Sequence, residues 1–278
     1  MNVDRVLAEI EPFTAARVMK KLSGGPASDS YLVERDAERF VLRIDTGIAA
    51  AFGLDRQAEV EILTLVSQTG LGPVPEFADP GQGILVTRYV EGRAWTENDL
   101  RDPERIRSLA ALLRQLHALE PQGCHFDIHE KVDRYARAIG TPEGDSLAEN
   151  TRELLRKLDD ASVSQCLCHN DLTCANIIEG QGLTLIDWEY AAIGDPLFDL
   201  ATIVEHHRFN AVEEEVLLGA YFDTASAKDI GRYQRHRVLY RYLLVLWLTS
   251  VGRLGGLGPE QQNRLRQEWA LLKTGGSL

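Results

Sequence analysis

One short segment limits the folds open to this 278-residue chain more than any other. It reads HNDLTCAN at residues 169–176 and is followed, eleven residues after Asn176, by Asp187 at the end of the apolar run LTLI. The surrounding residues 165–199 lack the helical spacing of their neighbours and are predicted as strand, loop, strand and loop. A fold that contains this segment has to turn the loop back, so that Asp171, Asn176 and Asp187 meet at one site.

The spacing of these three polar residues is typical of phosphoryl transfer. In kinases a loop Asp contacts the acceptor hydroxyl, an Asn five residues later binds a metal ion on the phosphates, and a second Asp bridges metal and phosphates. Each residue alone has an ordinary explanation, because loop Asn residues usually make turn hydrogen bonds. Their occurrence together and in this order favours a kinase, with Asp171 as the catalytic residue and Asn176 and Asp187 as ligands of Mg²⁺.

The wider sequence around these residues resembles a known family. The run HNDLTCANII…LTLIDWEYAAIGDPLFDLA is similar to the choline/ethanolamine kinase group, within the aminoglycoside-phosphotransferase-like kinases, and IDWEYA is its most specific part. The resemblance implies an α+β, two-lobed protein-kinase-like fold with a small antiparallel-sheet N-lobe and a larger, mainly helical C-lobe. Because helical patterns dominate after Glu91-Gly92, we expect the N-lobe at residues 1–91 and the C-lobe at residues 92–278.

The resemblance also implies an ATP site in the N-lobe. The small residues 24–30 resemble the phosphate loop of these kinases, and residues 84–92, ILVTRYVEG, resemble their hinge strand. Alternation in the strand 40–44 puts Val41 and Arg43 on one face, below adenine and phosphate respectively. Glu59 is expected to pair with Arg43, although a surface charge explains it equally well. The full set of expected ATP-binding residues is Gly24, Gly25, Ser28, Ser30, Val41, Arg43, Glu59, Tyr89, Val90 and Glu91.

The acceptor is predicted to be a small alcohol that carries a positive charge. A quaternary ammonium binds to aromatic faces and carboxylates, and five residues of the C-lobe offer these groups. They are Glu189, Tyr190, Glu205, Tyr240 and Trp247. For the aromatic residues on the helix that contains Tyr240 and Trp247, packing in the core is an equally good explanation.

The sequence lacks features with which protein kinases accommodate a protein substrate. Asn170 replaces the Arg that precedes the catalytic Asp, and only seven residues separate Asp187 from Asp195. The predicted function is therefore ATP-dependent phosphorylation of choline or ethanolamine. A thiamine kinase and an aminoglycoside phosphotransferase remain open, as does an ATP-binding pseudokinase or scaffold. An unrelated acidic binding protein is the remotest alternative.

The composition limits the kinds of partner that the protein can bind and indicates its cellular location. A net charge of -12 and a pI of about 5.1 disfavour nucleic acid as a partner. The four cysteines, Cys124, Cys166, Cys168 and Cys174, contain no CxxC pair, which favours reduced thiols over a zinc site. The N-terminus lacks the apolar stretch of a signal peptide, and no segment has the length of a membrane span. We expect a cytoplasmic protein, and the sequence does not define its oligomeric state.

Hydrophobic periodicity and capping signals predict the remaining elements. Helices are predicted at residues 3–10, 56–69, 130–139 and 146–159 and after Asp102-Pro103, and strands at residues 40–44 and 84–90. The Gly- and Pro-rich residues 69–83 are predicted as a loop. Asp195 and Asp199 are expected to brace the catalytic loop, His169 to bond backbone near Asp187, and His117 to pack in the core.

Overall fold

The structure is a computed structural model that describes residues 3–22, 25–120, 127–158 and 163–274. Its α-helices are α1 (Val3–Glu9), α2 (Arg56–Gln68), α3 (Pro103–His117), α4 (Ile128–Ile139), α5 (Pro142–Leu158), α6 (Pro196–His206), α7 (Ala211–Tyr221), α8 (Ala227–Arg253) and α9 (Pro259–Thr274). Its strands are β1 (Arg17–Lys21), β2 (Ser28–Arg35), β3 (Glu38–Asp45), β4 (Pro75–Asp79), β5 (Ile84–Arg88), β6 (Arg93–Ala94), β7 (Cys166–Cys168), β8 (Ile177–Glu179), β9 (Leu183–Leu185) and β10 (Ala192–Gly194). Short 3₁₀ helices are η1 (Ala49–Phe52), η2 (Asp99–Arg101) and η3 (Cys174–Asn176).

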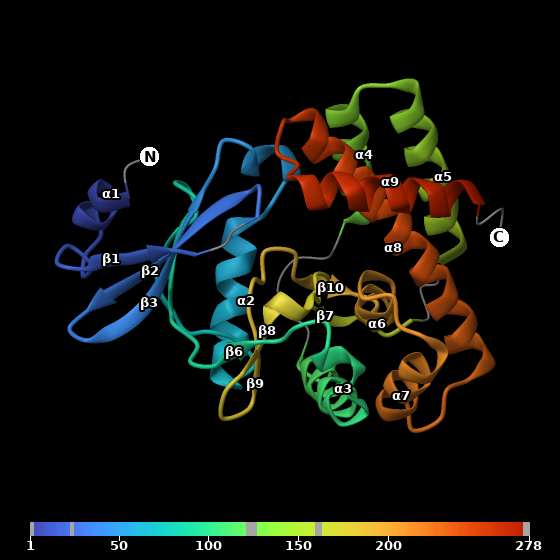
Figure 1. Ribbon diagram of the computed structural model, residues 1–278, viewed down its shortest axis with the longest axis horizontal. Helices are drawn as coiled ribbons and strands as arrows, with labels where there is room; N and C mark the ends of the chain where they lie inside the picture. Colours follow the sequence, from blue (N-terminus) through green and yellow to red (C-terminus); the bar gives the residue numbers. More distant parts are fainter. Residues whose placement is uncertain (1–2, 23–24, 121–126, 159–162, 275–278) are drawn as a thin grey trace.

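The N-terminal part is an antiparallel sheet with strand order β1-β2-β3-β5-β4. Figure 1 shows it at one side of the molecule, with α2 between it and the helical part. Alternation along β3 works as predicted: Phe40, Leu42 and Ile44 are buried in one apolar cluster with residues of α1. Val41 and Arg43 therefore point to the opposite face, toward the helical part.

Helix α2 begins and ends where its capping signals predict. The Asp55 side chain accepts a hydrogen bond of 2.9 Å from the backbone N–H of Ala58, and Gly70 follows the helix with a φ of 76°. Ile62, Leu63 and Val66 are buried against Leu85 of the sheet and against the core of the helical part. The helix thereby fixes the sheet to the remainder of the chain.

The C-terminal part is mainly helical and is built around the 27-residue helix α8. Helices α4, α5, α6 and α9 pack against α8, while α7 packs against α3 (Figure 1). Two small sheets, β10-β7 and β6-β8-β9, lie between these helices and the N-terminal sheet. These small sheets carry the loop at residues 169–176 and the strand that leads to Asp187.

Two strands of the N-terminal sheet were not expected from the sequence. Residues 75–79 form β4, so the prediction of a continuous loop over residues 69–83 is wrong there. The strand pairs with β5 through an irregular register between Pro75 and Phe77, which hides its alternation in a Gly- and Pro-rich context. Strand β1 is an edge strand whose residues are largely exposed, so it has no apolar pattern. No helix of the described residues is long and apolar enough to cross a bilayer.

Candidate active site

Residues 169–176 form a loop between β7 and β8 that turns back on itself. Asn170 and Asp187 both adopt left-handed backbone conformations, each with a φ of 64°, which is uncommon for residues other than glycine. The Asn170 side chain stabilises this geometry by donating a 2.9 Å hydrogen bond to the backbone carbonyl of Tyr190. Such backbone geometry is concentrated at functional sites.

A buried carboxylate holds this loop in place. Asp199, in the first turn of α6, accepts hydrogen bonds from the backbone N–H groups of His169 at 2.9 Å and Asn170 at 2.7 Å. Its Oδ2 also lies 3.1 Å from Nε2 of the packed His117. His169 in turn places its Nε2 2.9 Å from the carbonyl oxygen of Ile186. The loop is thus tied to α6, α3 and the residue before Asp187.

Asp195, the other residue expected to brace the loop, acts on a helix instead. It is the N-cap of α6, accepting a 3.0 Å hydrogen bond from the backbone N–H of Leu197. Its carboxylate also pairs with Arg232 and with His236 of α8. Asp195 therefore fixes α6, and through it Asp199, against α8.

The three polar residues predicted from the sequence lie together. Asn176 Nδ2 donates to the backbone carbonyl of Asp171 at 2.9 Å and approaches the Asp171 carboxylate at 3.3 Å. Because its nitrogen is used, the side-chain oxygen of Asn176 remains as a ligand. The Asp187 side chain is 43% exposed and lies 3.8 Å from Arg43. Amide and carboxylate oxygens suit Mg²⁺, so these residues fit such an ion.

A cleft of about 530 Å³ opens beside these residues, between the N-terminal sheet and the loop. Asn176 and Asp187 are among the residues that line it. Most of the expected ATP-binding residues line it, namely Gly25, Ser28, Ser30, Val41, Arg43, Glu59, Tyr89 and Val90. Gly24 lies outside the described residues, and the Glu91 carboxylate pairs with Arg39 instead of lining the cleft.

A buried charge network forms the wall of the cleft next to Asp187. The Arg43 guanidinium makes a two-pronged ion pair with Glu59 of α2, whose side chain is only 2% exposed. Arg56 donates to the same carboxylate at 3.0 Å and also contacts Asp45 at 2.6 Å. The network joins β3 to α2 and fixes the Arg43 guanidinium in the wall of the cleft.

The sequence matches the phosphotransferase enzyme family over residues 18–237. The chain belongs to this family. A relative, the protein LicA homolog of Mycoplasma capricolum subsp. capricolum, is 28% identical over 183 residues, which cover 64% of this chain and 72% of the relative.

Solved structures agree with this assignment. The choline kinase LicA from Streptococcus pneumoniae superposes with a TM-score of 0.74 at 25% identity, covering 92% of this chain and 95% of that one. A structure of LicA in complex with AMP gives a TM-score of 0.78 at 24% identity, with coverages of 98% and 97%. The predicted two-lobed, protein-kinase-like α+β fold and the prediction of a small-molecule kinase are confirmed.

Beyond the catalytic loop, this phosphotransferase has an aromatic and acidic region. Trp247 Nε1 donates to the Tyr190 hydroxyl at 3.2 Å, and the adjacent Glu189 accepts from Arg56 at 3.1 Å. The Lys131 ammonium lies 5.2 Å from the centroid of the Tyr190 ring, so one ring face already accepts a cation. Burial and then the charge of Asp187 raise the pKa of Glu189 to about 8.

The other two residues expected to bind the acceptor lie on α6 and α8. The Tyr240 hydroxyl is 2.7 Å from Nδ1 of His206, and both burial and the charge of Asp171 raise the pKa of Tyr240. Glu205 has its two carboxylate oxygens on Arg237 and Arg241. Its negative charge is therefore already compensated, unlike that of a carboxylate that faces an open site.

Two further residues near this region were not predicted from the sequence. Tyr135 of α4 is buried, and its pKa is raised by that burial and then by the charges of Glu189 and Asp171. Phe52 of η1 packs between Tyr135 and Trp247, with ring centroids 6.4 Å and 6.3 Å away. Both come from segments whose patterns indicate only ordinary core, so nothing in the sequence could have placed them beside Glu189.

The Asp171 carboxylate has an unusual protonation equilibrium. Burial and then the negative charge of Asp187 raise the pKa of Asp171 to about 7, although the hydrogen bond from Asn176 opposes the shift. An unfolded aspartic acid has a pKa of about 3.9. The folded state therefore holds an extra proton between these values and is destabilised once the carboxylate ionises.

Replacing this carboxylate is expected to stabilise the metal-free protein. At pH 8, above the folded pKa, Asp171→Asn should be more stable than the wild type by ~1 kcal/mol or more, and the gain should shrink as the pH falls through 7 toward 5. Urea unfolding at both pH values measures this difference, with the exposed Asp145→Asn as the matched control. A gain that is equal at both pH values would show that the ionised carboxylate is not its cause.

Proposed function

We propose that this phosphotransferase transfers the γ-phosphate of ATP, as its Mg²⁺ complex, to the hydroxyl group of choline or ethanolamine. One observation carries the proposal. Asp171 contacts Asn176, which lines the cleft with Asp187, and its charge also acts on Tyr190 and Tyr240 of the aromatic region, so it is near both. A nucleotide phosphate on one side and a cationic alcohol on the other would therefore meet at this carboxylate.

The proposed roles follow from these positions. Asp171 accepts a hydrogen bond from the acceptor hydroxyl and takes its proton as the oxygen attacks the γ-phosphorus. Asn176 and Asp187 would hold Mg²⁺, which would supply charge neutralisation for the phosphates of ATP. Arg43, fixed by Glu59, binds phosphate. The transfer depends on orientation and electrostatic stabilisation, since no covalent enzyme intermediate is required.

Binding of ATP is supported by the shape of the cleft and by a relative. Gly25, Ser28 and Ser30 line the cleft, where N–H and hydroxyl groups can bind phosphate oxygens. Val41 supplies an apolar surface for the adenine, and the segment Tyr89–Val90 offers backbone groups to its edge. The similar LicA structure contains AMP, which fits this assignment.

An amino alcohol as acceptor is supported by the aromatic region. Tyr190, Trp247 and Tyr135 present ring faces, and Asp171 and Glu189 present carboxyl groups, within one part of the fold. This combination suits an ammonium group. The similar protein from Streptococcus pneumoniae is described as a choline kinase, which fits the same class of acceptor.

We also propose that the protein is cytoplasmic. We further propose that its two lobes have separate roles. Residues 1–91 would bind the nucleotide, and residues 92–278 would supply catalysis and bind the acceptor. Gly92 supports the boundary, because its φ is 151° and a Cβ there would come within 2.5 Å of the Glu179 carbonyl oxygen. The chain thus needs glycine at the junction.

The acceptor is tested by measuring ADP release from MgATP with choline, ethanolamine, thiamine and kanamycin offered separately. We expect release with choline or ethanolamine to exceed the ATP hydrolysis seen without an acceptor, and thiamine and kanamycin to add nothing. Release only with thiamine or kanamycin would overturn the proposed acceptor and leave the kinase assignment standing. ATP binding without release under any condition would indicate a pseudokinase.

A further inference from the structure

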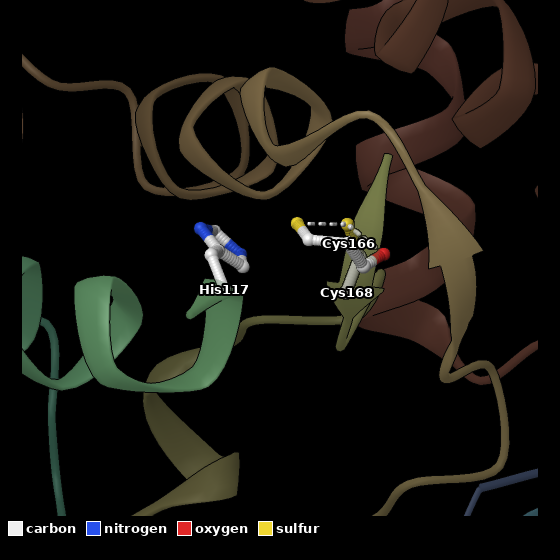
Figure 2. Close-up of side chains that lie close together, drawn as sticks. All are labelled: His117, Cys166 and Cys168. Carbon is white, nitrogen blue, oxygen red and sulfur yellow. Dashed lines mark hydrogen bonds between the residues drawn. The ribbon is translucent and has the colours of Figure 1, made fainter. Parts of the chain in front are cut away.

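Two groups of potential metal ligands lie outside the proposed catalytic residues in the described part of the chain. The first, shown in Figure 2, consists of His117, Cys166 and Cys168. The two thiols are buried 3.8 Å apart, and both ring nitrogens of His117 already face partners, the Tyr221 hydroxyl at 2.7 Å and Asp199 at 3.1 Å. An ion would have to enter a closed core and displace these contacts, so this group is packed core.

The second group is open to solvent and is made of three distant segments. Glu97 precedes η2, Cys174 begins η3 and His207 follows α6, yet their ligand atoms lie within 4.8 Å of one another. The Glu97 side chain is 56% exposed and Cys174 is partly exposed, whereas the His207 side chain is fully buried. An ion could therefore arrive from solvent on the side of Glu97 and find a fixed imidazole behind it.

The donor atoms of this group match the preferences of zinc. Carboxylate oxygen, thiolate sulfur and imidazole nitrogen are its usual ligands, and three protein ligands leave a fourth position for water. His207 Nδ1 already lies 2.9 Å from Oε1 of Glu97, so two of the three potential ligand atoms face one another. The nearby Arg101 is 3.6 Å from the Glu97 carboxylate but makes shorter contacts to Glu213 and the His207 carbonyl.

The imidazole of this group is in the protonation state that binds a cation. Burial lowers the pKa of His207, against the opposing effect of Glu97, so the imidazole is neutral at neutral pH, and its hydrogen bond to Glu97 would give way to the ion. A bound divalent ion would form a bond to the Cys174 sulfur and release the thiol proton to solvent.

The position of Cys174 links this group to the catalytic loop. Cys174 and Asn176 belong to the same short 3₁₀ helix, and the Asn176 N–H donates to the Thr173 carbonyl at 3.0 Å. Around a tetrahedral ion the donors would have to approach to roughly 3.5 Å of each other. That movement would pull on Cys174 and shift Asn176, and displacements of about 1 Å are sufficient to slow catalysis strongly.

We propose that Glu97, Cys174 and His207 form an inhibitory site for Zn²⁺, and that occupation of this site slows phosphoryl transfer by displacing Asn176. Binding of the ion depends only on the three donors. The inhibition rests on the proposed function, so the two parts are measured separately.

Binding is tested with Co²⁺ as a spectroscopic substitute for Zn²⁺ on the full chain. Wild-type protein should show thiolate-to-cobalt charge-transfer absorption that added Zn²⁺ removes. Cys174→Ser should abolish it, and Glu97→Gln should weaken the apparent affinity about tenfold or more, while the exposed Glu215→Gln should behave as wild type. Absence of the signal in the wild type, or its persistence in Cys174→Ser, would overturn the site.

Inhibition is tested by titrating Zn²⁺ into the enzyme with choline, ethanolamine and excess MgATP. Without Zn²⁺, Glu97→Gln should turn over at the wild-type rate, and it should need about tenfold more Zn²⁺ for half-inhibition. Equal sensitivity of both proteins would place the inhibitory ion at the catalytic Mg²⁺ position and overturn the regulatory part. Absence of turnover in every condition would instead count against the proposed function, and the cobalt experiment still decides the site.

Discussion

Asp171→Ala is expected to reduce the rate of phosphoryl transfer by about 10²–10⁴-fold while leaving ATP binding intact. The carboxylate is the group that would orient the acceptor hydroxyl and take its proton, and Ala offers no replacement. The hydrogen bonds that Asp199 accepts from the backbone N–H groups of His169 and Asn170 do not involve the Asp171 side chain, so the loop should keep its conformation.

The control for this prediction is Asp145→Ala. Asp145 is also an aspartate, but it is exposed in the first turn of α5, away from the cleft. Steady-state kinetics and nucleotide titration of both variants separate turnover from binding. A rate for Asp171→Ala within about threefold of the control would contradict its role, because removal of a general base costs more than that.

Glu59→Ala is expected to lower the free energy of unfolding by ~3–5 kcal/mol, because it leaves buried cations without their partner. Glu59 is the shared carboxylate of Arg43 and Arg56, and all three side chains are at most 10% exposed. The same change should weaken ATP binding, since Arg43 loses the ion pair that fixes it beside Asp187.

The matched control is Glu61→Ala, on the exposed side of the same helix. Glu61 is exposed and accepts a 3.0 Å hydrogen bond from Gln57 of the same helix, so its loss should change stability by less than ~0.5 kcal/mol. Urea unfolding compares the two variants, and nucleotide titration is done in conditions where both are folded. Equal stability of the two variants would show that the Arg43–Glu59 pair does not hold β3 to α2.

The catalytic loop could be predicted because its chemistry is local in the sequence. Asp171, Asn176 and Asp187 lie within seventeen residues, and each has to be a particular residue type at a particular distance. The apolar run LTLI also indicated the strand β9 that leads to Asp187. The helix caps Asp55 and Asp102 could also be predicted, because a cap depends on residues that are neighbours along the chain.

The acceptor region could be predicted only in part because it is assembled over long distances. Phe52, Tyr135 and Trp247 come from η1, α4 and α8, and nothing in any one segment indicates that the others are near. The pairing of Glu205 with Arg237 and Arg241 is likewise tertiary. An acidic residue at a suitable place in the sequence gives no sign of whether arginines already neutralise it.

The most direct test of the account is identification of the phosphorylated product. Wild-type enzyme is incubated with ATP labelled in the γ-phosphate, Mg²⁺ and choline or ethanolamine, and the label is followed by phosphorus NMR, with Asp171→Ala as the blank. The account predicts that the label appears in a phosphomonoester of the amino alcohol, in equal amount to ADP, and only with the wild type. Label found in inorganic phosphate alone, or in the same product with Asp171→Ala, would contradict it.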